Sequence, residues 1–208
     1  MDEDLNYFSK KEKNAINNIK SRRTKILLPI SKSLVKLGFT GDLISYLGFL
    51  MIIGFIYYVI KNPIMASVFL LLHVVIDGFD GPVARLRKED GDSGAFTDIL
   101  CDHTGMVVVI TTLIFVSLVN PLWAIIYVYL YSLMIIFVIL RNKLNLPIKV
   151  VVRTKYYVYI LYAIWALFGI NYLTYGLILF NILMLPSIIS SYFLFKSYLR
   201  GKKDEIKD

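Results

Sequence analysis

Long apolar stretches separated by short polar segments make up most of this chain. Most of them approach the roughly 20 residues that an α-helix needs to cross the hydrocarbon core of a bilayer. Asn62-Pro63 and Asn120-Pro121 interrupt the pattern in the way that helix boundaries do. The pattern predicts an all-α fold, a bundle of six transmembrane helices. Their expected ranges are 43–60, 64 to 85 or 88, 95–119, 122–140, 150–170 and 172–199.

The second of these stretches is unusual because its purely apolar part stops just before Asp77. That part alone is too short to cross a bilayer. We therefore expect one helix that continues through Asp77 and Asp80 to about Arg85 or Lys88. Pro82 lacks a backbone N–H and is expected to kink this helix just past Asp80.

The basic residues predict the orientation. Of the 23 Lys and Arg residues, Lys61 alone falls on the opposite side of the predicted bundle from the others. By the positive-inside rule, both termini and the 2–3 and 4–5 turns are cytoplasmic. We expect a single domain over 1–208, divided into a cytoplasmic or interfacial segment (1–42), the six helices (43–199) and a cytoplasmic tail (200–208).

Residues 5–36 mix apolar and basic positions, which predicts an amphipathic helix lying in the cytoplasmic membrane interface. A solvated basic arm is the alternative. Composition agrees with an integral cell-membrane protein, since 57% of residues are hydrophobic and the mean hydropathy is +0.65. In such a protein the net charge of +8 indicates anionic headgroups and phosphate-bearing substrates rather than nucleic acid.

Four aspartates stand in and beside the predicted second and third helices, where an unpaired carboxylate costs on the order of 2.5–3.5 kcal/mol. Asp77 and Asp80 are spaced i, i+3, and Asp98 and Asp102 are spaced i, i+4, so each pair shares a helix face. A hairpin around 89–94 can turn the two faces toward each other at the cytoplasmic edge of the membrane. Oxygen-only clusters favour Mg²⁺ or Mn²⁺, and four carboxylates suit two bridged ions of the kind used in phosphoryl chemistry. A buried structural ion cluster is the alternative.

The residues around Asp80 are small or basic. Gly78 and Gly81 are poor helix residues that leave the backbone open to a ligand, together with Ala84. Arg85 is a natural partner for phosphate. The stretch therefore suits the approach of a flat or phosphorylated ligand.

These residues resemble the CDP-alcohol phosphatidyltransferase family, which carries D-x2-D-G-x2-A-R-x8-G-x3-D-x3-D. The six-helix topology and the amphipathic N-terminal segment are also similar to that family, so the resemblance covers nearly the whole chain. The matching residues are Asp77, Asp80, Gly81, Ala84, Arg85, Gly94, Asp98 and Asp102.

The resemblance implies an enzyme of phospholipid biosynthesis that transfers a phosphatidyl-type or archaeal ether-lipid group from a CDP-linked lipid to a small polar alcohol, with release of CMP. Two divalent metal ions, Mg²⁺ or Mn²⁺, would be held by the four aspartates, and Asp102 would be the general base. Gly81, Ala84 and Arg85 would line the CDP site. The family likeness also implies a homodimer.

Family members often carry Pro-Asn-x-x-Thr before the first helix, and this chain departs from that pattern, with Gly41-Asp42 in place of Pro-Asn and Ser45 in place of Thr. Here Thr40 to Ser45 reads TGDLIS, and Thr40, Gly41 and Asp42 are the expected nucleotide contacts. Around Asp102 the chain is nearest the inositol-phosphate type, with His103 where that type has Arg. Arg153 and Lys155 fall inside or near the predicted membrane boundary, where a charge should have a purpose. A phosphorylated acceptor is the hypothesis for both, with Arg153 as the candidate contact, and anchoring at the membrane interface is the alternative.

Two other functions remain open at this stage. A headgroup transferase that moves an amino-alcohol phosphate from its CDP form to a diglyceride would use the same motif. A divalent-cation transporter would use the aspartates but would not need Gly81, Ala84 and Arg85 at these spacings. For His73, both a hydrogen bond to Asp77 and a packed position between helices are open, and His103 is expected to point about 100° away from Asp102 around the helix.

Overall fold

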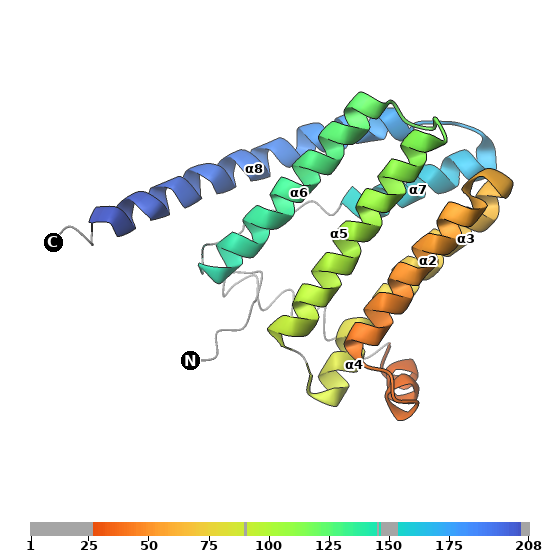
Figure 1. Ribbon diagram of the computed structural model, residues 1–208, viewed down its shortest axis with the longest axis horizontal. Coiled ribbons are helices and arrows are strands. Elements are labelled where there is room, and N and C mark those ends of the chain that lie inside the picture. Colours follow the sequence, from red (N-terminus) through yellow and green to blue (C-terminus); the bar gives the residue numbers. More distant parts are fainter. Residues whose placement is uncertain (1–26, 90, 145, 147–153, 205–208) are drawn as a thin grey trace.

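A computed structural model describes residues 27–89, 91–144, 146 and 154–204, and nearly all of them are helical (Figure 1). The all-α prediction is confirmed. Residues 27–36 are helical, while the rest of the expected amphipathic segment lies outside the described residues. The helices that follow are α2 (Gly41–Lys61), α3 (Pro63–Asp77), α4 (Asp80–Arg87), α5 (Asp92–Phe115), α6 (Pro121–Lys143), α7 (Thr154–Phe168) and α8 (Leu173–Asp204).

Short polar residues begin the first two of these helices. The Thr40 hydroxyl accepts a hydrogen bond from the Leu43 N–H at 3.2 Å, and the Asn62 side chain accepts one from the Met65 N–H at 3.1 Å. Both satisfy N–H groups that a helix start leaves unpaired. Pro63 at the first position of α3 loses no helical hydrogen bond there. One residue, Asn62, therefore suffices to reverse the chain between α2 and α3.

The prediction of one continuous helix through Asp77 and Asp80 is wrong in detail. α3 ends at Asp77, Gly78 and Phe79 form a turn, and α4 starts at Asp80. The break therefore precedes Asp80, whereas we expected a kink after it. The reason is that a proline acts on the carbonyl four residues earlier, which for Pro82 is that of Gly78.

α5 begins and ends earlier than the apolar pattern predicted. It starts at Asp92 rather than Ala95 and ends at Phe115 rather than Val119. Ser117 takes the left-handed conformation with φ +57°, and the Leu118 N–H bonds the Leu113 carbonyl at 3.0 Å. This is the Schellman arrangement that closes a helix. Hydropathy continues through this turn and so does not mark it.

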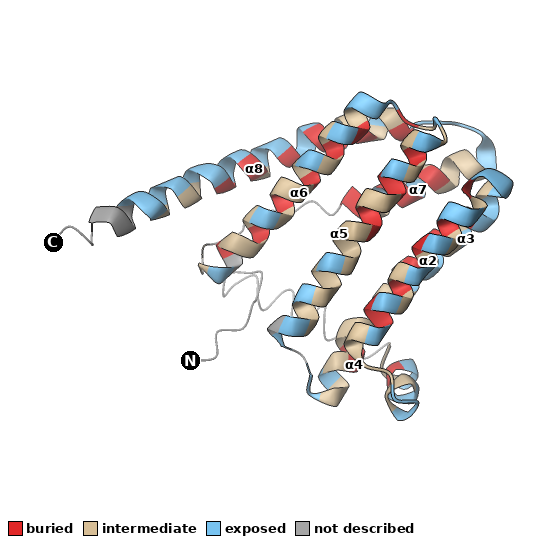
Figure 2. Ribbon diagram, in the orientation of Figure 1, coloured by how far each residue is buried: buried red, intermediate tan, exposed pale blue. Residues whose placement is uncertain are grey.

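Among the described residues, five helical segments are long and apolar enough to cross a membrane, with α3 and α4 counted as one. Their ranges are Gly41–Lys61, Pro63–Arg87, Ser93–Phe115, Pro121–Arg141 and Leu173–Arg200. The described part of the expected span at 150–170 is α7, and residues 150–153 of that span lie outside the described residues. Buried residues face into the bundle, while exposed ones run along the outer sides of the helices (Figure 2). Many of these exposed side chains are large and apolar, such as Ile60, Leu71 and Phe115, as a lipid-facing surface requires.

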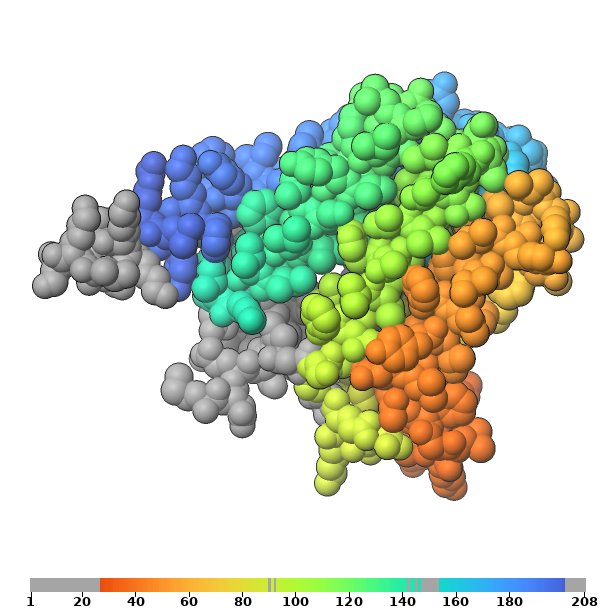
Figure 3. Space-filling model, in the orientation of Figure 1, coloured from red at the N-terminus to blue at the C-terminus, as the bar shows by residue number. Residues whose placement is uncertain are grey.

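The core joins all the long helices. α2 packs on α3 and α5, α3 on α7, and α6 on α8. Fully buried aromatic and aliphatic side chains fill the centre, among them Phe55, Met106, Tyr127 and Tyr162. α4 and the helix at 27–36 project together at one end of the molecule (Figure 3). The hairpin with the aspartates is thus at the end of the bundle rather than in its middle.

Candidate active site

Three of the four aspartates meet in one cluster. Asp77 is the last residue of α3, and Asp98 and Asp102 lie in the first turns of α5. One carboxylate oxygen from each can be chosen so that all three lie within 4.8 Å of one another. Their i, i+4 spacing puts Asp98 and Asp102 on one face of α5, and the end of α3 lies against that face. The convergence predicted from the spacing is confirmed for these three residues.

Asp80 stands beside this group rather than within it. As the first residue of α4, it accepts a hydrogen bond on its Oδ1 from the Gly81 N–H at 2.5 Å. It lies close enough to Asp98 for the two carboxyl groups to interact directly. The turn at Gly78 and Phe79 explains the separation, since a break between Asp77 and Asp80 removes their common helix face. All four aspartates nevertheless lie on the same α3–α4–α5 hairpin.

The donor set fits a divalent metal ion. Asp77, Asp98 and Asp102 offer only carboxylate oxygens, all partly buried, and they would repel one another if no cation lay among them. Hard ions such as Mg²⁺ and Mn²⁺ prefer oxygen ligands of this kind. The chemistry of the cluster therefore suits metal-assisted phosphoryl chemistry.

A lysine that the sequence did not assign to this cluster lies in it. The Lys155 ammonium, from the first turn of α7, is 2.5 Å from Asp102 Oδ1 and 3.4 Å from Asp77 Oδ2. Lys155 is only 3% exposed. The sequence placed Lys155 near the membrane boundary and suggested that it contacts a phosphorylated acceptor, together with Arg153. Its charge there was the available signal, because a cation at membrane depth needs a partner.

The expected nucleotide contacts surround the hairpin. A Cβ placed on Gly41 would lie 3.0 Å from Ala84 Cβ and 3.3 Å from the Asp80 carbonyl oxygen, so the start of α2 touches α4 directly. A Cβ on Gly94 would lie 3.6 Å from Asp42 Oδ1. Gly41 and Asp42, at the start of α2, therefore lie beside Ala84 and Gly94 of the aspartate motif.

Three more residues were expected from the sequence to bind substrate, namely Thr40, Gly81 and Arg153. Thr40 caps α2 with its hydroxyl. Gly81 lies under the Arg85 guanidinium, because a Cβ on Gly81 would lie 3.2 Å from an Arg85 terminal nitrogen. Arg153 lies outside the described residues.

The two histidines are helix-packing residues. His73 is 1% exposed, and its Nδ1 lies 2.9 Å from the Gly48 carbonyl oxygen of α2. Of the two positions left open for His73, the structure has the packed one. His103 stacks on Tyr131 and contacts Ser132 at 3.4 Å, both on α6.

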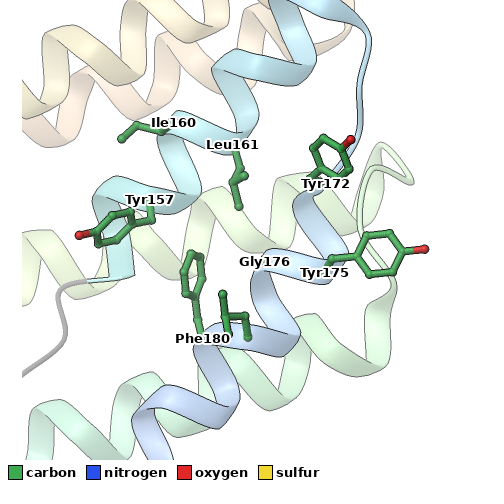
Figure 4. A pocket seen from close by; sticks show the side chains of 8 residues that line it. Tyr157, Ile160, Leu161, Tyr172, Tyr175, Gly176 and Phe180 are labelled. Carbon is green, nitrogen blue, oxygen red and sulfur yellow. The ribbon is translucent and has the colours of Figure 1, made fainter.

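A separate apolar groove of about 370 Å³ lies between α7 and α8 (Figure 4). Tyr157, Leu161, Tyr175 and Phe180 line it, and Leu161 packs over Gly176 where the helices approach. None of its lining residues belongs to the aspartate cluster. Its lining has no carboxylate, histidine or lysine, so the candidate site is the hairpin.

Comparison with known proteins identifies the family of this chain. The family model for CDP-alcohol phosphatidyltransferase matches residues 39–193, and the chain belongs to this family. No curated protein sequence matches the chain significantly.

Solved structures of phosphatidylinositol phosphate synthase PgsA1 from Mycobacterium tuberculosis are similar in fold. The form with CDP-DAG bound has a TM-score of 0.69 and 17% identity, and the match covers 81% of this chain and 92% of that one. The complex with manganese and citrate has a TM-score of 0.67 and 16% identity, with 79% and 86% covered.

Proposed function

We propose that this protein is a membrane transferase that moves a phosphatidyl-type or archaeal ether-lipid group from a CDP-linked lipid to the hydroxyl of a small polar alcohol. The observation that carries this proposal is the meeting of Asp77, Asp98 and Asp102, with Asp80 beside them, at the spacing of the family motif. A structural ion cluster would not require the adjoining Gly81, Ala84 and Arg85.

In this proposal the four aspartates hold two divalent ions, Mg²⁺ or Mn²⁺. When bound, such ions neutralise the pyrophosphate of the donor and polarise its phosphoryl oxygens. The PgsA1 complex with manganese supports a divalent metal in a protein of the same fold. Asp77 and Asp98, on facing helices, would fix the position of the metals relative to the bundle.

Asp102 is the proposed general base. Its carboxylate takes the proton of the acceptor hydroxyl while that oxygen bonds to the β-phosphorus of the donor. The bond from this phosphorus to the CMP oxygen breaks, and CMP leaves. A positioned carboxylate typically contributes about 10²–10⁴-fold to such a step.

The other site residues would bind the donor nucleotide. Gly41 and Ala84 allow α2 and α4 to approach closely, which forms one side of the proposed CDP site. Arg85 would pair with a donor phosphate. The remaining proposed contacts are Thr40, Asp42, Gly81 and Gly94.

The acceptor in our proposal is a phosphorylated alcohol of the inositol-phosphate type. The sequence around Asp102 supports this choice, and so does the fold similarity to PgsA1, a phosphatidylinositol phosphate synthase. Arg153 would contact the acceptor phosphate, because its charge lies near the predicted membrane boundary. An Arg153→Ala variant should raise the acceptor KM and leave the donor KM unchanged.

The proposed setting is the cell membrane, with six spanning helices, both termini cytoplasmic and the aspartates at the cytoplasmic side. The whole of 1–208 would be one domain. We further propose a homodimer, as the family likeness implies. These proposals rest on the charge pattern and on the family, and the labelling experiment in the Discussion tests the orientation.

The decisive experiment measures CMP release by the purified protein with a CDP-lipid, Mg²⁺ or Mn²⁺, and one acceptor at a time from inositol phosphate, glycerol phosphate, serine and inositol. An Asp102→Asn variant is the control. Metal-dependent release with one acceptor, lost in the variant, establishes the transferase and identifies its product. No release with any acceptor contradicts the proposal, and the protein should then be assayed as a headgroup transferase with a CDP-amino-alcohol and as a cation transporter.

A further inference from the structure

The ion pairs of Lys155 need an explanation beyond the proposed transfer reaction. Its side chain is 4% exposed and contacts Asp77 and Asp102, which are 78 and 53 residues earlier in the chain. Burying an ammonium is unfavourable unless opposite charges surround it. Asp77 and Asp102 supply the opposite charge that Lys155 needs, and the aspartates gain a cation.

The same two aspartates belong to the group that can hold a metal. Mg²⁺ bound to carboxylate oxygen lies at about 2.0–2.1 Å from it. An ion on the Asp102 oxygen that now contacts Lys155 would be within about 4.6 Å of the ammonium, given the 2.5 Å Lys155–Asp102 contact. Two cations at that distance in a partly buried site repel strongly. The ammonium and the metal ion therefore compete for one place.

We propose that Lys155 is a built-in counter-ion of the metal site: its ammonium neutralises Asp77 and Asp102 while no divalent ion is bound, and a divalent ion must displace it to bind. The long, flexible side chain of lysine permits this movement without a change in the helices. This inference rests on the metal site of the proposed function but not on the reaction or the acceptor.

The exchange predicts a specific effect on metal binding. Lys155→Met keeps much of the apolar stem and removes the charge. The metal-free variant should unfold at a lower temperature than the wild type, because the aspartates then lack a counter-ion. Titration calorimetry with Mn²⁺ should give a Kd about tenfold lower than for the wild type, equivalent to about 1.4 kcal/mol.

Lys196→Met is the matched control. Lys196 is an exposed lysine of α8, and its ammonium lies over the Tyr192 ring, 5.7 Å from the centroid. This variant changes the net charge equally and should leave the Kd for Mn²⁺ unchanged. An unchanged or higher Kd in Lys155→Met overturns the proposal, since it would mean that the ammonium does not oppose the metal.

A second measurement uses the wild-type protein and so does not depend on the folding of a variant. An amine-acylating reagent followed by mass spectrometry reports the accessibility of each lysine. Lys155 should react slowly without metal and several-fold faster with saturating Mn²⁺, while Lys196 reacts equally in both. Equal reaction of Lys155 in both conditions contradicts displacement.

The experiments separate the two proposals. If the wild type binds no Mn²⁺ at all, the metal site itself fails, and with it the proposed function. If the wild type binds Mn²⁺ and Lys155→Met binds it no more tightly, only the counter-ion role fails.

Discussion

At the scale of single residues, the missing side chain of Gly41 lets the start of α2 lie directly against α4. A Cβ there would lie 3.0 Å from Ala84 Cβ and 3.3 Å from a backbone oxygen that cannot move independently. Gly41→Ala should therefore push α2 away from α4, destabilise the protein by about 1–3 kcal/mol and raise the KM for the CDP-lipid. Thermal unfolding and donor titration measure the two effects.

Gly91→Ala is the control for this prediction. A Cβ at Gly91 meets nothing within 4 Å, and its φ of −130° suits any residue. It should leave the KM for the CDP-lipid unchanged and lower stability only by the modest cost of a weaker N-cap for α5. If Gly41→Ala behaves in the same way as Gly91→Ala, close contact between α2 and α4 is not needed for donor binding.

His73 tests whether a residue near the aspartates is structural. It bridges α3 and α2 through the Gly48 carbonyl and stacks edge-on against Tyr159 of α7. His73→Leu removes this interhelical hydrogen bond, while the Gly48 carbonyl keeps its bond within α2. Such a loss typically costs about 0.5–1.5 kcal/mol. We expect a lower melting temperature and, below it, an unchanged kcat for CMP release. A large fall in kcat without loss of stability would instead assign His73 to the reaction.

At the scale of helices, the turn between α3 and α4 sets the position of Asp80. Pro82→Ala restores an N–H that can bond the Gly78 carbonyl and removes the ring that disfavours a continuous helix. Asp80 should then rotate toward the face of Asp77, and metal affinity should change by severalfold while stability is retained. Titration with Mn²⁺ measures this change.

Pro186, inside α8, provides the comparison. It lies in a helix that carries none of the aspartates, so Pro186→Ala should leave the metal affinity as it is. Equal affinities in both variants would show that the break at Gly78 does not govern the site.

At the scale of the whole molecule, the orientation in the membrane can be tested with one reactive group. Cys101 is the only cysteine, so Cys101→Ser provides a cysteine-free background. In intact cells, a membrane-impermeant thiol reagent should label Lys61→Cys in that background and should not label Glu89→Cys. After the cells are opened, both should react. The reverse pattern would place the aspartate hairpin outside the cell.

Much of the fold could be predicted because it follows from local rules. Apolar stretches of membrane length and the breaks at Asn62-Pro63 and Asn120-Pro121 depend only on residues close together in the chain. The ends of the helices were predicted less accurately. The end of α5 was missed because the residues around Ser117 are apolar, and the break before Asp80 was missed because Pro82 acts on a carbonyl four residues earlier.

The sequence by itself determined that this is a helical membrane protein with four aspartates at fixed spacing on one hairpin. Hydropathy and helical periodicity are enough for that, because both are properties of single segments. Only the tertiary structure decided that Asp80 stands beside the other three, that Gly41 touches Ala84, and that Lys155 lies between Asp77 and Asp102. Such contacts depend on how separate helices pack, and no pattern within one helix specifies which buried charge meets which.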